Sequence, residues 1–534
     1  MMNIKEKNRQ EENIIRSLTA ERPRNTKELA QWKRRLSQET GQSIISNNQL
    51  LAAYFKLIPP NKVDPDIVQL LKKRAIRTMS GVAPVAILTK PYPCPGHCRY
   101  CPQQADVPTS YLANEPAVMR ARHCHYDPTK QIHYRLRALI ANGHQPTKIE
   151  LIIIGGTWSY LPKKYQYWYV ANCYAAANTY GKTIRRYRQN LSFNQLKKAL
   201  AKEQTINESA DYRLVGLTLE TRPDCLTPKE LARLREFGCT RVEIGVQIID
   251  DRILHLNQRT TTVKDIVQAT KLLRDWGFKI TYHLMPALPG SSPDHDIAMY
   301  KKLFTDPRFQ PDQIKFYPTV VVKGSKLYED WLKGQYKPYS DNELIRVIKS
   351  CKMATPPYVR IVRLIRDIPK ESIEAGNKIT NLRQIIQRQG VQCHCIRCRE
   401  VKDKAVDWSN LQLVTRRYRA GDGQEYFLSW ESPDQSILFG FCRLYLPKQP
   451  ANNPDLNNCA LIRELHIYGI LQPLGSQGQV QHRGLGQKLL AQAEKIAQEH
   501  HYSKVAIISG VGVRNYYRKF GYRLSHTYLI KAVL

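Results

Sequence analysis

The sequence predicts an α/β fold with a partial parallel (βα) barrel, a short metal-binding connector and a second, mixed α/β domain. Three observations support this prediction. Seven strand-like runs alternate with helical patterns between residues 82 and 365, the alternation stops at a cysteine-rich stretch near residue 390, and new strands flank a glycine turn and a helix beyond residue 405. We therefore divide the chain into regions 1–75, 76–370, 371–405 and 406–534.

The chain is long and strongly basic. Its 534 residues exceed what one hydrophobic core usually organises, so several domains are expected. The 82 Lys and Arg against 46 Asp and Glu give a formal charge of +36, which attracts polyanions such as nucleic acids. In region 1–75, short apolar groups alternate with bases, which indicates small helices with a basic binding face, or else a merely solvated surface. The bases are Lys33, Arg34, Arg35, Lys72, Lys73 and Arg74.

The sequence also bears on the cellular compartment. No apolar run approaches the ~20 residues that a membrane-spanning helix needs, and no lipidation motif is present. The N-terminal residues mix acids with bases and lack the apolar stretch of a signal peptide. The 13 cysteines crowd at two short spacings, which in a reducing compartment indicates metal ligation rather than disulfides. We expect a cytoplasmic protein that does not bind membranes.

The strand-like runs define about six βα units. They are VAPVAILTK, IELIIIGG, RLVGLTLE, TRVEIGVQ, KITYHLMP, QIKFYPTV and YVRIVRLI. Helices are expected between them: Thr227-Pro-Lys-Glu230 has the features of an N-cap, a first-turn proline and a capping box. One apolar helical face follows in the next unit, formed by Val263, Ile266, Val267, Thr270 and Leu273. Parallel barrels carry their chemistry at the carboxyl ends of the strands, so functional residues should follow these runs.

The first cysteine group lies just after the first strand. Cys94, Cys98 and Cys101 have C-x3-C-x2-C spacing. Three thiolates can hold a four-iron cluster and leave one iron open for a small chelating ligand, whereas structural zinc normally takes four protein ligands. The alternatives are a zinc knuckle completed by His97 or Cys124, or three ordinary buried thiols.

The second cysteine group lies in the connector. Cys393, Cys395 and Cys398 have a thiolate-rich spacing that suits zinc, with His394 or a distant side chain as fourth ligand. A structural metal there would fix the orientation of the two domains, because a short connector builds little core. Reduced surface thiols are the alternative.

The last region has the pattern of a phosphate cradle. A strand at residues 463–470 is followed by Gln481-His-Arg-Gly-Leu-Gly486, which opens a helix. One apolar face of that helix is formed by Leu485, Leu489, Ala493 and Ile496. Backbone N–H groups at such a helix start are unpaired, and together with the helix dipole they favour a pyrophosphate group.

The first cysteine loop, with an aromatic residue before its last cysteine, resembles that of the radical S-adenosylmethionine superfamily. The resemblance implies a [4Fe-4S] cluster and S-adenosylmethionine. It places Gly155 and Gly156 beside the methionyl group, Glu220 near the ribose hydroxyls and Gln247 near the adenosyl moiety. An ordinary glycine turn and a solvated acidic strand end are the alternatives.

The Q-x-x-G-x-G turn, the strand KVAIISG and the segment NYYRKFGY resemble the GNAT acetyltransferases. That resemblance implies acetyl-CoA, with Tyr517 near the thioester, although Tyr517 could also belong to the core because Tyr516 points to another face. Backbone contacts to acetyl-CoA are then expected at Glu464, Leu465, His466 and Ile467, and at Leu485, Gly486 and Gln487.

The two halves in one basic chain resemble the catalytic subunit of Elongator and its stand-alone bacterial and archaeal relatives. The likeness includes SGVAPVAILTKPYPCPGHCRYCP, HLMPALPG, RELHIYG and SGVGVRNYYRKFGYRL in family order. The short cysteine loop is of the bacterial type, so the other Elongator subunits should not be required.

This resemblance implies a tRNA-modifying acyltransferase. A deoxyadenosyl radical would take hydrogen from the acetyl methyl of acetyl-CoA, the carbon radical would add to carbon 5 of the wobble uridine, and thioester hydrolysis would give 5-carboxymethyluridine. Lys148 matches a family position that contacts acetyl-CoA from the barrel side. The alternative is an ordinary surface lysine. Lys148 and Tyr517 are the expected catalytic residues. Lys315 and Tyr317 could meet the substrate.

The expected partners are the tRNA anticodon region, bound through region 1–75 among others, and an electron donor. Two other functions are alternatives to this hypothesis of a tRNA-modifying enzyme. A protein lysine acetyltransferase would use the iron–sulfur half only as a scaffold, and a tRNA-binding protein would have lost catalysis altogether. The open-iron cysteine count and both glycine motifs favour the modifying enzyme.

Overall fold

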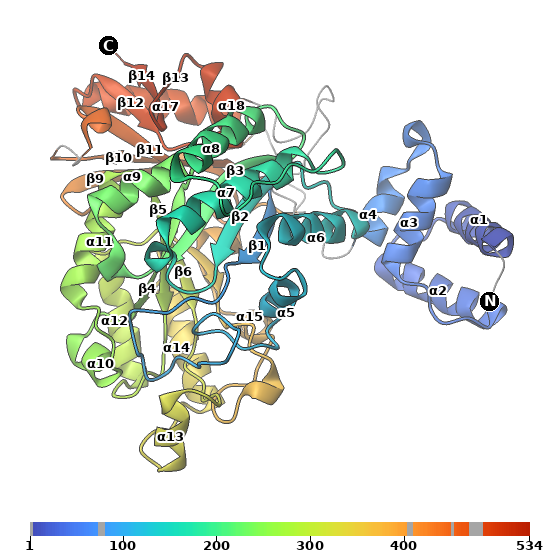
Figure 1. Ribbon diagram of the computed structural model, residues 1–534, viewed down its shortest axis with the longest axis horizontal. Coiled ribbons are helices and arrows are strands. Elements are labelled where there is room, and N and C mark those ends of the chain that lie inside the picture. Colours follow the sequence, from blue (N-terminus) through green and yellow to red (C-terminus); the bar gives the residue numbers. More distant parts are fainter. Residues whose placement is uncertain (1–3, 73–80, 403–409, 450–452, 469–483, 534) are drawn as a thin grey trace.

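The computed structural model describes residues 4–72, 81–402, 410–449, 453–468 and 484–533. Two seven-stranded sheets and a set of N-terminal helices make up the molecule (Figure 1). The first sheet lies in the middle, the second sheet lies against one end of it, and the N-terminal helices stand to one side. This arrangement confirms the predicted α/β fold.

The first sheet is a partial parallel barrel. Its strands follow the order β1 to β7 without a crossover, and every neighbouring pair is parallel. The strands are β1 (Ala83–Leu88), β2 (Lys148–Ile154), β3 (Arg213–Thr221), β4 (Arg241–Gln247), β5 (Lys279–Leu284), β6 (Gln313–Phe316) and β7 (Arg360–Arg363). Five strands lie within the predicted runs, and β2 and β3 each extend one residue beyond theirs, at Lys148 and Thr221. Strands β1 and β7 are the two edges of the sheet.

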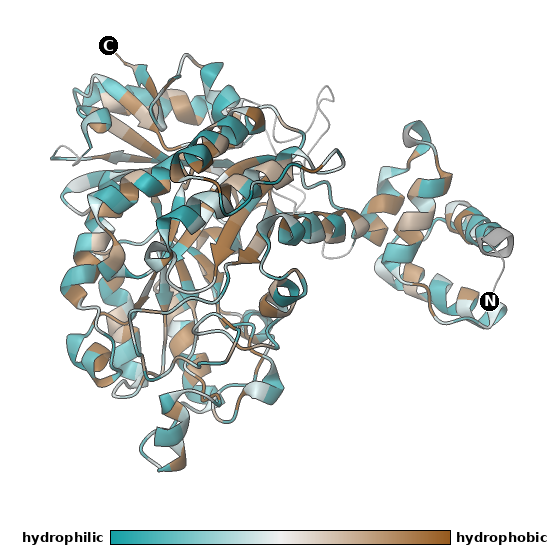
Figure 2. Cartoon of the chain, viewed as in Figure 1, coloured by the Kyte–Doolittle hydropathy of each residue, from teal (hydrophilic) through white to brown (hydrophobic). Residues whose placement is uncertain are grey.

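Helices connect the barrel strands. They are α5 (Pro116–His123), α6 (Pro128–Ala141), α7 (Lys163–Asn178), α8 (Phe193–Asn207), α9 (Pro228–Glu236), α10 (Asp251–Leu256), α11 (Val263–Asp275), α12 (Pro293–Thr305), α13 (Lys326–Leu332) and α14 (Asp341–Met353). The apolar side chains of the strands and of the facing helices form one large core, which appears as brown central strands in Figure 2. In α11 the predicted face packs inward, because Ile266, Thr270 and Leu273 are all buried.

Helix α9 begins largely as predicted. Thr227 caps it by accepting a hydrogen bond from the Glu230 amide, and Pro228 occupies the first turn. The predicted reciprocal bond from the Glu230 side chain is wrong. Glu230 instead pairs with Arg233 at 2.9 Å, since a cation one turn away competes for its carboxylate.

The second sheet is mixed, as predicted. Its order is β13-β14-β12-β11-β10-β9-β8, and β11 with β12 is its parallel pair. The strands are β8 (Gln412–Ala420), β9 (Gly423–Glu431), β10 (Leu438–Leu446), β11 (Cys459–Ile467), β12 (Lys504–Ile507), β13 (Arg523–Ser525) and β14 (Tyr528–Ala532). Helix α17 (Leu485–Glu499) packs on one face through the four predicted apolar residues, and α18 (Arg514–Arg518) follows β12.

The N-terminal helices have an apolar core of their own. They are α1 (Ile4–Glu21), α2 (Thr26–Thr40), α3 (Asn47–Leu57) and α4 (Pro65–Leu71). The prediction that Lys33 lies on an exposed basic face is wrong, because Lys33 is 9% exposed and donates to Asn47. Arg34 is exposed and Arg35 pairs with Glu21, whereas predicted bases 73 and 74 lie outside the described residues.

The connector between the sheets contains two short helices, α15 (Leu382–Arg388) and α16 (Ile396–Arg399). Among the described helices, none combines the length and the hydropathy that a membrane span requires.

Candidate functional site

The first cysteine loop lies at the carboxyl ends of the barrel strands. Distant segments hold its backbone: the Arg99 amide donates to the Asn257 carbonyl at 3.1 Å, and the Leu327 amide donates to the Arg99 carbonyl at 2.8 Å. Cys98 is buried, whereas Cys94 and Cys101 are partly exposed. One loop therefore presents three thiols at the predicted end of the barrel.

Local interactions favour thiolate at Cys98. A hydrogen bond from Cys101 and then the Arg259 charge lower the pKa of Cys98 to about 5, against the opposing effect of burial. The same pairing with Cys98, together with burial, raises the pKa of Cys101. A side chain at Gly96 would displace the Arg222 guanidinium, which hydrogen bonds to Asp224 and Thr260 hold in place. Cys98 lies near two buried cations, Arg259 and Arg222, and Cys101 lies near Arg259, which fits an anionic iron–sulfur cluster. Cys94, Cys98 and Cys101 would hold that cluster.

The predicted glycine pair ends β2 beside this loop. Gly155 and Gly156 have φ of +128° and +99°, a region that favours glycine. A side chain at Gly155 would collide with Thr89 after β1, whereas the nearest atom to one at Gly156 is 3.9 Å away. The pair therefore allows close approach of two strand ends and leaves space above Gly156.

Glu220 and Gln247 stand at the ends of β3 and β4. The Tyr111 hydroxyl donates to Glu220 Oε2 at 3.1 Å, and the Glu220 side chain keeps 21% exposure. Gln247 has φ +67°, and its Oε1 is buried with no hydrogen-bond partner among the described residues. Such an unpaired buried oxygen needs an explanation, and a ligand donor would provide one. A β-bulge just before Gln247 turns its side chain out of the regular alternation.

Charged side chains line the inside of the barrel. Arg241 on β4 contacts Glu150 on β2 at 2.8 Å and Gln313 on β6 at 3.4 Å. Because these strands are not neighbours in the sheet, the contacts cross the concave interior. Parallel barrels usually fill this space with branched apolar residues, so a polar interior here calls for a functional reason.

The polar contacts continue towards the cysteine loop. Glu243 is 1% exposed; Lys315 and His283 contact it, with His283 Nε2 at 2.8 Å. Burial alone would raise the pKa of Glu243, but Lys315, His283 and Arg241 hold it well below its usual range. His283 Nδ1 lies 3.6 Å from Glu220, which joins this interior cluster to the upper site.

The parallel pairing of β11 with β12 ends at Ile462, before β11 itself ends at Ile467. Beyond Ile462, the side of β11 that faces away from β10 has no strand partner among the described residues. The register with β10 shifts at Arg463, which is the extra residue of a β-bulge. The predicted contact residues Glu464, Leu465, His466 and Ile467 form this open edge.

Helix α17 starts beside the open edge. Gly484, with φ +70°, precedes its first residue, Leu485, so the helix N-terminus carries unpaired amides. A side chain at Gly486 would lie 2.7 Å from the Tyr516 hydroxyl and 3.6 Å from Ile467. Gln487 follows on the exposed side. Residues 481–483 of the predicted turn lie outside the described residues.

The two tyrosines of α18 differ in position. Tyr517 is 7% exposed and packs in the core of the second sheet, where burial raises its pKa. Tyr516 is 39% exposed, and its hydroxyl is the one that faces Gly486. The structure thus brings Tyr516 to the start of α17 and puts Tyr517 behind it.

The open edge faces the amino ends of the barrel strands. Lys148, the first residue of β2, is half-buried, and burial followed by the Arg213 charge lowers its pKa. Gly512, after β12, approaches Arg213 so closely that a side chain would lie 2.6 Å away. His466 Nε2 is buried without a hydrogen-bond partner in the described residues, and burial lowers the pKa of His466 to about 4.

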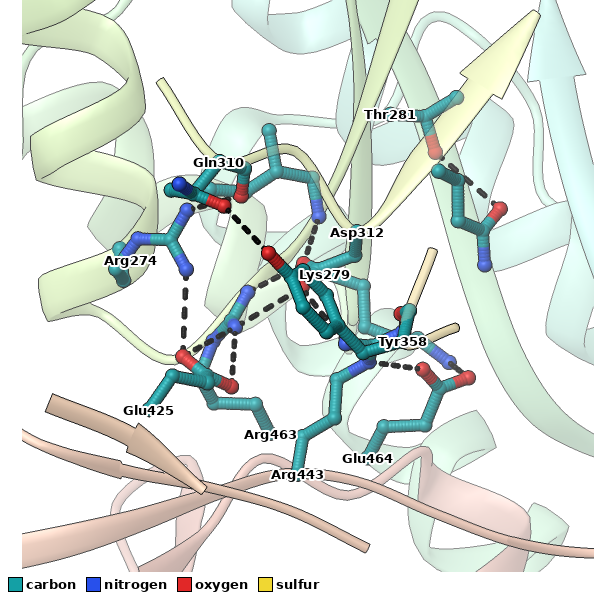
Figure 3. A network of polar contacts seen from close by, with 12 residues as sticks. Arg274, Lys279, Thr281, Gln310, Asp312, Tyr358, Glu425, Arg443, Arg463 and Glu464 are labelled. Carbon is teal, nitrogen blue, oxygen red and sulfur yellow. Dashed lines mark hydrogen bonds and ion pairs between the residues drawn. The ribbon is translucent and has the colours of Figure 1, made fainter. Parts of the chain in front are cut away.

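Buried ion pairs hold the second sheet against the barrel (Figure 3). Arg463 reaches from β11 to Asp312, at 3.1 Å for the Nη1–Oδ1 pair, and to Glu425 at 2.8 Å. Arg443 contacts Asp312 at 3.4 Å and Glu464 at 3.1 Å. The side chains of all these residues except Glu464 are fully buried. Two other cations complete the network, Arg274 beside Glu425 and Lys279 beside Glu464.

Comparisons with known proteins agree with this architecture. Residues 92–303 match the model of the radical SAM superfamily, and residues 311–390 match the model of the radical SAM C-terminal domain. The tRNA uridine(34) acetyltransferase of Dehalococcoides mccartyi is 44% identical over 86% of this chain and 99% of that protein. The chain belongs to the family of tRNA uridine(34) acetyltransferases and Elongator complex protein 3. The human Elongator complex protein 3 is 37% identical over 86% of both chains.

A solved structure of a family member has the same fold. The archaeal Methanocaldococcus infernus Elp3, lacking its first 46 residues, superposes with a TM-score of 0.72 at 38% identity and covers 85% of this chain. Membership of the radical SAM superfamily implies a [4Fe-4S] cluster and S-adenosylmethionine, which agrees with the three thiols and the open strand ends.

This family member also brings its second cysteine group together. The sulfur atoms of Cys393, Cys395 and Cys398 lie within 4.8 Å of one another. Hydrogen bonds from Cys393 and Cys398 lower the pKa of Cys395, whereas hydrogen bonds with Cys395 and Cys398 raise the pKa of Cys393. His394 does not join the group among the described residues, and Lys352 Nζ lies 3.6 Å from Cys398.

Sequence reasoning missed several residues of this family's site. Arg259, Tyr111, His283 and Glu243 contact the predicted residues, but each comes from a separate strand end or loop. No spacing pattern marks them, because their partners lie 40 to 161 positions away. Tyr516, whose hydroxyl faces Gly486, lies within the predicted motif but has no role in the sequence prediction.

Proposed function

We propose that the protein modifies the wobble uridine of tRNA, using S-adenosylmethionine radical chemistry and acetyl-CoA to form 5-carboxymethyluridine. The names of the bacterial and archaeal relatives, tRNA uridine(34) acetyltransferase, support the substrate and the position. The charge of +36 supports an RNA partner. The anticodon region is the part of the tRNA that the site takes.

The observation that carries the proposal is a series of polar contacts inside the barrel between the two candidate sites, from Glu150 through Arg241, Glu243 and His283 to Glu220. The cysteine loop and Glu220 lie at the upper end of the barrel, and Lys148 and the open edge of β11 lie at its lower end. Between Lys148 and Gly155 the chain rises by roughly 23 Å at about 3.3 Å per residue. In this proposal the acetyl group enters the barrel from the lower end, where the charged side chains of the interior can hydrogen-bond a thioester carbonyl.

Each predicted residue has a role in this proposal. Cys94, Cys98 and Cys101 hold the cluster, which supplies the electron for S-adenosylmethionine cleavage when bound. S-adenosylmethionine lies against Gly155, Gly156, Glu220 and Gln247. Acetyl-CoA lies along Glu464–Ile467 with its pyrophosphate at Leu485, Gly486 and Gln487, where helix amides face an anion.

Other parts of the chain complete the proposal. Lys148 and Tyr517 are the proposed catalytic residues near the thioester. Region 1–75 binds tRNA, region 76–370 is the radical domain, region 371–405 holds zinc at Cys393, Cys395 and Cys398, and region 406–534 binds acetyl-CoA. An electron donor is required, the other Elongator subunits are not, and the protein works in the cytoplasm.

Isotope transfer tests the proposal. Acetyl-CoA deuterated on its methyl group is incubated with reconstituted enzyme, S-adenosylmethionine, a reductant and tRNA. We expect deuterium in 5′-deoxyadenosine and a carboxymethyl group on the wobble uridine, both measured by mass spectrometry. Normal uridine modification without acetyl-CoA, or 5′-deoxyadenosine that never carries deuterium, would overturn the proposal.

A second measurement separates the proposal from lysine acetylation. An acetyltransferase passes the acetyl group intact to an amine, so it needs no S-adenosylmethionine and leaves the methyl hydrogens in place. Histone-type peptides should therefore gain no acetyl group above the rate without enzyme, while tRNA from cells that lack the gene should lose its modified wobble uridine.

A further inference from the structure

Arg259 lies directly beneath the cysteine loop. Its Nη1 donates to Cys98 Sγ at 3.6 Å and to the Tyr100 hydroxyl at 3.3 Å, and its Nη2 donates to the Gly245 carbonyl of β4. The side chain is 8% exposed. The backbone amide of Arg259 also donates to the Leu254 carbonyl at 3.0 Å, so both ends of the residue are fixed.

Arg259 has no carboxylate partner within 4.0 Å in the part of the chain that the structure describes. Two other arginines near the loop differ in this respect: Arg222 pairs with Asp224 at 2.7 Å, and Arg99 pairs with Asp330 at 2.5 Å. A buried cation is costly unless an anion compensates it. Apart from the Tyr100 hydroxyl, which accepts a hydrogen bond as a neutral group, the nearest group that can carry that negative charge is the Cys98 sulfur.

We propose that Arg259 is the built-in counter-charge of the iron–sulfur cluster and that its hydrogen bond to the Cys98 sulfur raises the reduction potential of that cluster. Reduction adds one negative charge to the cluster. A cation and an N–H group at a ligand sulfur stabilise the reduced form more than the oxidised form, because the interaction grows with the negative charge. Arg259 is thus a positioning residue that makes the cluster easier to reduce.

The hydrogen bond from Arg259 to the Gly245 carbonyl gives this side chain a structural role as well. Gly245 precedes Gln247 by two residues, at the strand end assigned to the adenosyl moiety. A side chain at Gly245 would lie 3.2 Å from Arg259 Nη2, so the glycine admits the guanidinium to the strand carbonyl. One side chain therefore joins the cluster loop to the end of β4.

The reduction potential tests this inference. The cluster is reconstituted in the full chain, and its reduced form is followed by electron paramagnetic resonance during a redox titration without tRNA or acetyl-CoA. In Arg259→Gln we expect the ratio of reduced to oxidised cluster at a fixed solution potential to fall at least tenfold, which is about 59 mV for one electron. Arg259→Lys keeps the charge but loses the paired N–H groups of the guanidinium. Its ratio of reduced to oxidised cluster should therefore lie between those of Arg259→Gln and the unmodified protein.

Arg99→Gln is the matched control. Arg99 lies in the same loop, next to Cys98, but Asp330 already compensates its charge. Its replacement should leave the potential unchanged. If Arg259→Gln takes up full iron and its ratio stays within about threefold of the unmodified protein, or if Arg99→Gln changes the ratio equally, the inference is wrong.

Failure to hold the cluster is also informative. If folded Arg259→Gln loses iron while folded Arg99→Gln retains it, the counter-charge role is supported, because the cluster then depends on this guanidinium. The measurement requires only the radical SAM cluster. Its outcome is therefore independent of whether the proposed carboxymethyl chemistry is correct.

Discussion

Replacing Asp312 by asparagine should loosen the contact between the barrel and the second sheet. Asp312 is 1% exposed; Arg463 and Arg443 contact it, and it accepts the Ile280 amide at 2.8 Å. Asparagine keeps the shape but removes the negative charge. The buried network then has three arginines and one lysine against only two carboxylates, Glu425 and Glu464.

The size of the effect follows from the charges. Burial alone would raise the pKa of Asp312, but Arg463, Arg443 and Arg274 lower it to about 2 from 3.8. A difference of about two pKa units corresponds to roughly 2.5 kcal/mol. Removing one partner of a buried ion pair costs about 3–5 kcal/mol. We therefore expect about 3 kcal/mol of destabilisation near neutral pH.

The pH dependence has a definite sign. Because the folded-state pKa of Asp312 is lowered, its contribution is fully present above pH 3.8 and is lost as the pH falls through about 2. The difference between Asp312→Asn and the unmodified protein should be constant from neutral pH down to about 4 and should shrink below it.

Urea unfolding followed by circular dichroism measures this difference through the transition midpoint. Asp211→Asn is the control, since the Lys182–Asp211 pair is 62% and 68% exposed and such pairs contribute at most about 1 kcal/mol. Adding Arg463→Gln to Asp312→Asn should recover part of the loss. If Asp312→Asn shifts the midpoint no more than Asp211→Asn does, the reasoning is refuted.

Three other predictions concern the sites. Cys98→Ala should abolish cluster absorbance and S-adenosylmethionine cleavage but leave acetyl-CoA binding intact; a fully loaded, active variant would contradict the radical assignment. Gly486→Trp should displace Tyr516 and weaken acetyl-CoA binding at least tenfold by calorimetry, while cluster absorbance stays normal; undiminished affinity would exclude the proposed cradle. Cys395→Ser should lower bound zinc, measured by elemental analysis, and reduce the melting temperature by several degrees; equal zinc in both proteins would show that Cys393 and its neighbours hold no metal.

Local patterns predicted much of the fold. All seven barrel strands and the apolar face of α17 were visible, because burial on one or both faces leaves a short-range signal in the sequence. Lys33 was misassigned because one turn of helix gives no sign of which face meets a neighbour. Its amine bonds to Asn47, which comes from another helix.

The candidate site was predictable only where a motif carries it. The cysteine loop and the Gly486 turn are continuous in sequence, so family resemblance located them. The Arg259–Cys98 and Asp312–Arg463 contacts join residues 161 and 151 positions apart. Such pairings have no local spacing rule, and only the folded chain shows which buried cation lacks a carboxylate.

The charged lower end of the barrel affects how the protein is made. During synthesis Asp312 leaves the ribosome 151 residues before Arg463, which corresponds to roughly 8–30 s at about 5–20 residues per second. Within that interval β7 completes the barrel while the strands of the second sheet are still being made. The uncovered end exposes Asp312, Arg274 and Lys279 to water beside the apolar residues that later pack against Leu461, Ile508 and Tyr528. Charged groups therefore keep part of that end hydrated until the C-terminal strands arrive.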